Sequence, residues 1–206
     1  MRKIITIGRE FGSGGRELGR RLSEELGIAY YDQEIITEIA KRTEMSEEYV
    51  RQVSESRPAV SYPIHVRHSF YPTSNTTVQQ SVKVFAEQHK LLKELAQKSD
   101  CVIVGRCADY VLRDERPLRI FVYADTPSKI KRCIERKSVD ESMTEAQMIK
   151  KMKEIDKGRA KYYEFFSEHR WGDKENYDLM VNTSGADIKL VCAAIAGYLK
   201  KIYEQD

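Results

Sequence analysis

Short apolar runs rich in β-branched residues alternate along the chain with longer segments whose apolar residues recur at helical spacing. The short runs predict strands at residues 3–7, 28–31, 100–105, 118–124 and 177–183. The longer segments predict helices at residues 15–26, 32–43, 77–98, 144–166 and 187–203, with two more beginning near residues 46 and 125. This alternation predicts an α/β fold with a doubly wound sheet of five parallel strands, which bind ligands at their carboxyl ends.

Residues at the expected helix ends support these boundaries. Gly27 follows the first helix and is suited to end it. Pro127 stands where proline is favoured, in the first turn of a helix that Asp125 introduces. Asp32, directly after the second strand, either caps the next helix or faces an acceptor site. Residues 56–76 hold three of the five prolines and predict a long loop or flap.

The first expected strand runs straight into a glycine-rich segment and then a helix. Glycines let successive backbone N–H groups point at one anion, and the helix N-terminus adds partial positive charge. This order predicts a phosphate-binding loop rather than a dinucleotide site, because G-x-G-x-x-G does not fit the glycine spacing. The residues expected to bind phosphate are Arg9, Gly12, Ser13, Gly14, Gly15, Arg16 and Glu17.

This loop lacks the lysine and hydroxyl of the pattern G-x-x-x-x-G-K-[ST]. Arg9 or Arg16 can stand in for the lysine, because an arginine is a fixed cation that binds phosphate. Glu17 either complements the helix dipole or coordinates magnesium through oxygen, and Asp100 is a second candidate for holding the metal through water. We leave the metal ligands open.

Two further segments carry candidate phosphate-binding arginines. Arg106 follows Gly105 at the end of a buried strand, where it either points into the ligand crevice or pairs at the surface with Asp109. Arg159 belongs to a highly charged helix that is either a solvated face or a lid contacting phosphate. Helical spacing places Lys153, Asp156, Lys157 and Lys161 on one face of that helix.

Composition limits the classes of function. The net charge of +3 in 206 residues argues against a dedicated nucleic-acid-binding protein. Four cysteines without a C-x-x-C pair predict free thiols and no zinc site. No signal peptide or membrane-length apolar run is evident, so we expect a cytoplasmic protein of one domain without a membrane partner.

With these motifs in view, the chain resembles the cytidylate kinase-like family of P-loop nucleoside monophosphate kinases. The resemblance is carried by residues 5–17, Tyr31-Asp32, residues 102–106, residues 156–163, Trp171-Gly172 and residues 176–179. It implies a three-layer P-loop NTPase fold with a core (1–31, 98–139 and 172–206), a helical monophosphate-binding insertion at about 32–97 and a lid at about 140–171. It also implies ATP and Mg²⁺ as cofactors.

Within that resemblance, Arg16, Arg106 and Arg159 are the expected catalytic residues, with Arg132 behind Arg159. Arg106 and Asp32 are expected to bind the acceptor. The first hypothesis is therefore ATP-dependent phosphorylation of a CMP-like nucleoside monophosphate. Two alternatives remain open: a non-catalytic nucleotide or phosphate sensor, which the missing lysine supports, and a kinase for another small molecule. The oligomeric state stays open.

Overall fold

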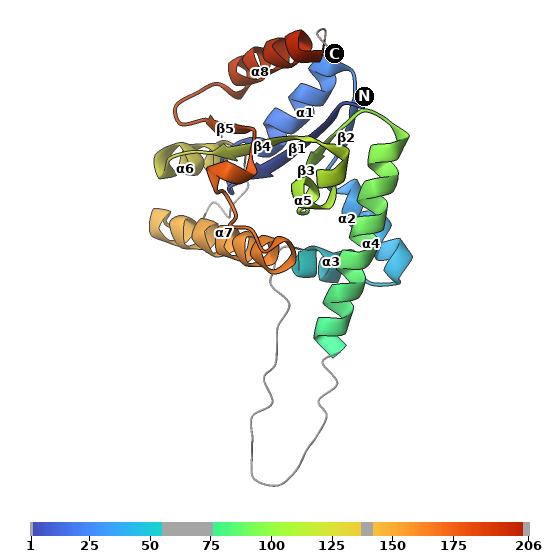
Figure 1. Ribbon diagram of the computed structural model, residues 1–206. Helices are drawn as coiled ribbons and strands as arrows, with labels where there is room; N and C mark the ends of the chain where they lie inside the picture. The colour runs from blue at the N-terminus through green and yellow to red at the C-terminus, as the bar shows by residue number, and fades with distance from the viewer. Residues whose placement is uncertain (1, 55–75, 137–141, 204–206) are drawn as a thin grey trace.

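The computed structural model describes residues 2–54, 76–136 and 142–203 of the chain. Five parallel strands form one sheet in the order β2-β3-β1-β4-β5 (Figure 1). The strands are β1 (Ile4–Arg9), β2 (Ala29–Tyr31), β3 (Cys101–Val104), β4 (Leu118–Tyr123) and β5 (Leu179–Asn182). The expected doubly wound parallel sheet is confirmed, and β1 lies at its centre. β1 runs two residues further than expected, so that Arg9 ends the strand.

Helices connect the strands and lie on both faces of the sheet (Figure 1). Each expected helix is present within a few residues of its expected bounds. Three short elements were not expected, because one turn is too short to show periodicity: α5 and the 3₁₀ turns at Arg113–Glu115 and Lys174–Asn176. The helices are α1 (Gly15–Leu26), α2 (Glu34–Thr43), α3 (Glu47–Ser54), α4 (Thr76–Lys98), α5 (Ala108–Val111), α6 (Thr126–Glu135), α7 (Glu145–Ser167) and α8 (Ile188–Tyr203).

Alternate residues of β1 and β3 enter different cores. Ile5 and Ile7 of β1 pack with α1 and α8 on one face of the sheet. Ile4 and Ile103 pack on the other face with apolar residues of α2, α3, α4 and α5. Because β1 and β3 are buried on both faces, they read in the sequence as continuous apolar runs. The result is a three-layer arrangement that fixes the carboxyl edge of the sheet.

Capping contacts explain where several helices begin. Asp125 accepts a hydrogen bond from the Ser128 N–H at 2.9 Å, and Thr144 forms a capping box with Gln147 at the start of α7. Gly27 ends α1 in the left-handed conformation. The expectation that Asp32 caps α2 is wrong, because Gln33 occupies that position and no side chain caps the helix. Asp32 is instead held by a cation on α1.

The remaining expectations about the chain have mixed outcomes. All four cysteines are free and buried, as expected. The expected flap at 56–76 lies almost wholly outside the described residues. Among the helices that the structure describes, none has the length and apolar character needed to cross a membrane.

The α1 face of the core can be tested with a matched pair of leucines. Leu22 of α1 is fully buried against the sheet and α8, whereas Leu190 of α8 is 70% exposed. We expect Leu22→Ala to lower the free energy of unfolding by about 2–5 kcal/mol through lost burial and a cavity. Leu190→Ala is expected to change it by less than about 0.5 kcal/mol. Urea unfolding followed by circular dichroism measures both; equal losses would contradict this packing.

Candidate functional site

The glycine loop between β1 and α1 presents backbone to a cavity. Gly12 and Gly14 adopt positive φ angles of 74° and 85°, a conformation that favours glycine. Gly14 is the N-cap of α1, and no side chain caps the helix. The N–H groups of the first helical turn therefore have no acceptor within the helix, and the partial positive charge of the helix is concentrated there. The geometry is that of an anion-binding loop.

Ser13 braces this loop from beneath. Its hydroxyl donates to the Glu10 carbonyl at 2.8 Å, and its own carbonyl accepts from the Thr183 hydroxyl at 2.7 Å. The side chain is fully buried, and Ser13 does not line the cavity. Ser13 therefore shapes the loop, whereas Gly12, Gly14 and Gly15 line the cavity.

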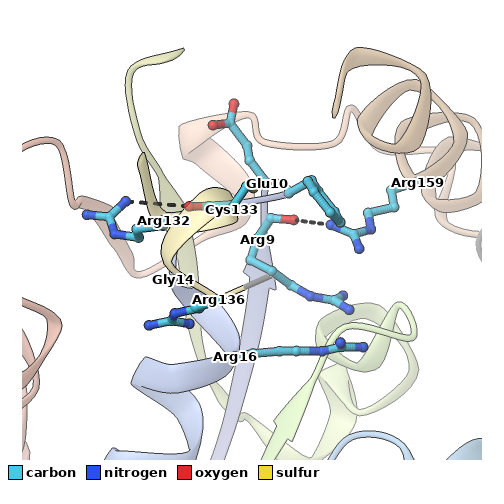
Figure 2. Close-up of a pocket in the computed structure, with 11 residues that line it drawn as sticks. Arg9, Glu10, Gly14, Arg16, Arg132, Cys133, Arg136 and Arg159 are labelled. Carbon is cyan, nitrogen blue, oxygen red and sulfur yellow. Dashed lines mark hydrogen bonds between the residues drawn. The ribbon is translucent and has the colours of Figure 1, made fainter. Parts of the chain in front are cut away.

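A cavity of about 320 Å³ lies over the loop, and its lining is strongly basic (Figure 2). Glu10 is the one carboxylate among the lining residues that the structure describes. Its Oε2 forms an ion pair with Lys129 Nζ at 2.5 Å. An excess of guanidinium groups beside a helix N-terminus favours a multiply charged anion. The lining arginines are Arg9, Arg16, Arg132, Arg136 and Arg159.

Arg9 is the most enclosed of these cations, with 8% of its surface exposed. Its side chain passes directly over Gly15 at the start of α1, since a Cβ atom on Gly15 would lie 2.5 Å from the Arg9 Cβ. The guanidinium ends beside Gly105, where a Cβ would lie 2.7 Å from the Arg9 Cζ. Both glycines therefore make room for Arg9.

Arg16 points away from α1 toward the edge of the sheet. Its Nε donates to Asp32 Oδ2 at 2.7 Å, and 47% of the Arg16 side chain is exposed. Asp32 is 5% exposed, and its other oxygen, Oδ1, is buried with no hydrogen-bond partner among the described residues. Asp32 lines neither this cavity nor the smaller one described below.

The two candidate magnesium ligands have other environments. The Glu17 carboxylate is held by Arg21 at 2.7 Å and by Arg136. Asp100 lies at the amino end of β3, where it accepts from the Lys3 N–H at 2.9 Å. The hypothesis that Asp100 holds the metal is therefore wrong, because it occupies the opposite edge of the sheet. Across the described ranges, no group of three or more acidic, histidine or cysteine side chains could hold a metal.

Helix α7 closes one side of the cavity through two contacts with the loop. Asp156 Oδ1 accepts from the Phe11 N–H at 2.7 Å. Arg159 donates to the Arg9 carbonyl at 3.4 Å, as Figure 2 shows. Burial raises the pKa of Asp156, although the Phe11 N–H and the nearby cations oppose the shift. Asp156 thus faces inward and not with the exposed lysines Lys153, Lys157 and Lys161, which corrects the single-face expectation.

A second, smaller cavity of about 30 Å³ lies beyond Arg9 at the ends of β1 and β3. Arg106, which is 4% exposed, lines it together with Arg9, Arg159 and several aromatic residues. The alternative of a surface pair with Asp109 is wrong, because Arg106 is buried and Asp109 accepts from the Tyr163 hydroxyl at 2.6 Å. Burial raises the pKa of Asp109. Arg9 and Arg159 line both cavities and therefore stand between them.

Comparison with known sequences gives the family. A sequence model described as the cytidylate kinase-like family matches residues 4–185. The chain belongs to the cytidylate kinase-like family. It is similar to a cytidylate kinase from Methanopyrus kandleri, with 26% identity over 191 residues that cover 88% of this chain and 84% of that protein.

Solved structures confirm the fold of this family member. An uncharacterized protein from Eubacterium ventriosum is 28% identical, with a TM-score of 0.69 over 97% of this chain and 99% of that one. Shikimate kinases from Acinetobacter baumannii (16% identical, TM-score 0.54, 100% and 95% covered) and Bacteroides thetaiotaomicron (13%, 0.57, 98% and 98%) share the fold alone. The P-loop kinase fold is thereby confirmed, and family and fold together are typical of nucleotide-binding phosphotransferases.

Several residues at the cavity were not among the sequence-based candidates. Arg136, the C-cap residue of α6, joins Arg132, which lies four residues before it on the same side of the helix. This four-residue spacing is the sequence signal that could have identified Arg136 as a second arginine at the cavity. Lys129 and Glu10 form an ion pair across the loop, and no local pattern pairs residues so far apart in sequence.

The contact between Asp156 and the loop yields a stability prediction. Asp156→Ala leaves the Phe11 N–H without its acceptor, so we expect the free energy of unfolding to fall by about 1–3 kcal/mol. Asp156→Asn keeps an oxygen at the same place, so its loss should be smaller. Chemical denaturation of both variants measures the difference. An Ala variant as stable as the original protein would contradict a role for Asp156 in holding the loop.

Proposed function

We propose that this protein transfers the γ-phosphoryl group of ATP to a nucleoside monophosphate, with CMP as the preferred acceptor. The observation that carries the proposal is the pair of neighbouring cavities, each lined by arginines, with Arg9 and Arg159 between them; Asp109 also lines the smaller one. Phosphoryl transfer needs a donor and an acceptor placed in line, with cations where charge builds up between them. The family and the similar cytidylate kinase favour a CMP-like acceptor.

The larger cavity fits the donor phosphates. Backbone N–H groups at the start of α1 and the surrounding arginines would hold the phosphate chain, with no side chain on Gly12, Gly14 or Gly15 to obstruct it. Magnesium would bridge the donor phosphates and keep most of its water ligands, which agrees with the lack of an acidic cluster in the described chain. Bound there, magnesium would offset the negative charge of the phosphates.

The smaller cavity lies where the acceptor phosphate would bind, and at about 30 Å³ it would have to widen to admit one. Arg106 would bind it through the guanidinium, whose paired N–H groups match phosphate oxygens. Asp32 follows β2 at the same edge of the sheet and keeps one buried oxygen that has no partner among the residues the structure describes; this oxygen would accept a hydrogen bond from the acceptor. Arg159 would contribute charge to the transferring group from α7, and Arg16 would hold Asp32 in place while bordering the donor phosphates.

The same proposal assigns roles to the parts of the chain. The core would comprise residues 1–31, 98–139 and 172–206. Residues 32–97 would form the monophosphate-binding insertion, and residues 140–171 would form the lid. The contacts of Asp156 and Arg159 with the loop support a lid that covers the donor phosphates. A closed lid excludes water, which favours transfer over hydrolysis.

The test is turnover with magnesium and ATP against a panel of nucleoside monophosphates, with ATP binding measured on the same sample. Transfer to CMP above the other nucleotides supports the proposal. Tight ATP binding without transfer to any nucleotide would contradict it and favour a sensor, for which the absence of a loop lysine is the specific argument. Transfer to shikimate or another non-nucleotide hydroxyl compound would point to a small-molecule kinase.

Arg106 provides a prediction specific to the acceptor. We expect Arg106→Lys, which keeps the charge but loses the paired N–H groups, to raise the KM for CMP about tenfold while the KM for ATP changes little. Steady-state kinetics with each substrate varied in turn measures the two constants. Arg20→Ala, on the exposed side of α1 and paired with Glu24, is the control and should change neither. Equal changes in the KM for CMP and the KM for ATP would contradict a specific role for Arg106 in binding the acceptor.

A further inference from the structure

We infer that the guanidinium of Arg9 replaces the ammonium group of the missing loop lysine. We further infer that the loop cannot carry side chains at both position 9 and position 15, because they would overlap. In the common pattern the cation stands at the start of the helix; here it stands at the end of β1. This inference rests on the proposed function, because it assigns the cation that holds the donor phosphates.

The register of the loop exposes the exchange. When Gly14 is matched to the second glycine of G-x-x-x-x-G-K-[ST], Arg9 falls where the pattern has its first glycine. Gly15 then falls where the pattern has its lysine. The chain has therefore gained a cation at one of these positions and lost one at the other.

The structure shows why the two changes belong together. A Cβ on Gly15 would lie 2.5 Å from the Cβ and 3.1 Å from the Cγ of Arg9, closer than carbon atoms pack. Gly15 lies in the first turn of α1 and has no positive φ, so its backbone would accept another residue. The side chain of Arg9 is what excludes one, and only one of the two positions can carry a side chain.

The place where Arg9 ends suits a cation in phosphoryl transfer. Its guanidinium lies beside Gly105, at the end of β3 and between the larger and the smaller cavity. Gly105 has a φ of 73°, which favours glycine, and a Cβ there would also displace this guanidinium. A largely enclosed cation acts through a lower effective dielectric than an exposed one, so its attraction for phosphate is stronger.

Arg16 is less well placed than Arg9 to replace the loop lysine. It lies one residue beyond the lysine position and is half exposed. Figure 2 shows both side chains extending the same way, with Arg9 nearer Arg159. Of the two candidates left open by the sequence, the geometry favours Arg9.

The experiment moves the cation back to the position that the common pattern uses. Four variants are compared with the original protein: Arg9→Gly, Gly15→Lys, the double variant Arg9→Gly/Gly15→Lys, and Arg9→Ala/Gly15→Lys. The probes are ATP, inorganic tripolyphosphate and adenosine, with binding measured by calorimetry. Melting temperature and circular dichroism show whether each variant is folded.

We expect Arg9→Gly to weaken ATP and tripolyphosphate binding about tenfold to 100-fold, while adenosine binding is unchanged. Gly15→Lys alone should lower the melting temperature, because the new Cβ overlaps Arg9. Arg9→Gly/Gly15→Lys should recover most of the lost affinity and transfer rate. Arg9→Ala/Gly15→Lys should not, because alanine keeps the Cβ that lies 2.5 Å from the new one.

Two results would overturn the inference. One is a folded Arg9→Gly variant that binds tripolyphosphate as tightly as the original protein. The other is a folded Arg9→Gly/Gly15→Lys variant that binds no more tightly than Arg9→Gly. Failure of the proposed function looks different: the original protein would transfer no phosphoryl group to any nucleotide, while the pattern of tripolyphosphate affinities would still decide the role of Arg9.

Discussion

The side chain of Arg9 occupies the space where three elements meet: the end of β1, the start of α1 and the end of β3. A cation with so little exposed surface loses hydration, so the surrounding structure must compensate for that cost. The chain leaves Gly15 and Gly105 without side chains to admit it. The central strand, the glycine loop and the turn before Arg106 are thus constrained by one guanidinium.

Other contacts hold the loop in the shape that this arrangement needs. Thr183, just beyond β5, supports Ser13 from below, and Asp156 of α7 holds the Phe11 N–H. These partners lie 170 and 145 residues away in the sequence. The geometry of the glycine loop is therefore a property of the assembled core, although the glycines that permit it are local. Because α7 supplies one of these contacts, the position of α7 and the shape of the loop are directly linked.

The sequence predicted the fold well because its signals are local and mutually consistent. Apolar runs on β1 and β3, helical periodicity on α1 and α8, and the caps at Asp125 and Gly27 all indicate the same alternation of elements. Local signals also misled in particular places. Asp32 has a residue type and position typical of a helix cap, yet its carboxylate forms an ion pair with Arg16 instead. Helical spacing places Asp156 beside exposed lysines, yet its side chain faces the loop, where it accepts a hydrogen bond from the Phe11 N–H.

What the sequence by itself determined is the order of elements and the presence of a glycine loop at the carboxyl edge of a parallel sheet, because hydrophobic spacing and backbone freedom are set residue by residue. It also determined that a lysine was missing and that Arg9 and Arg16 were the candidates to replace it. Only the tertiary structure decided between them. The choice depends on which side chain fits beside Gly15 and Gly105, and steric exclusion between residues from three separate elements exists only once those elements have packed together.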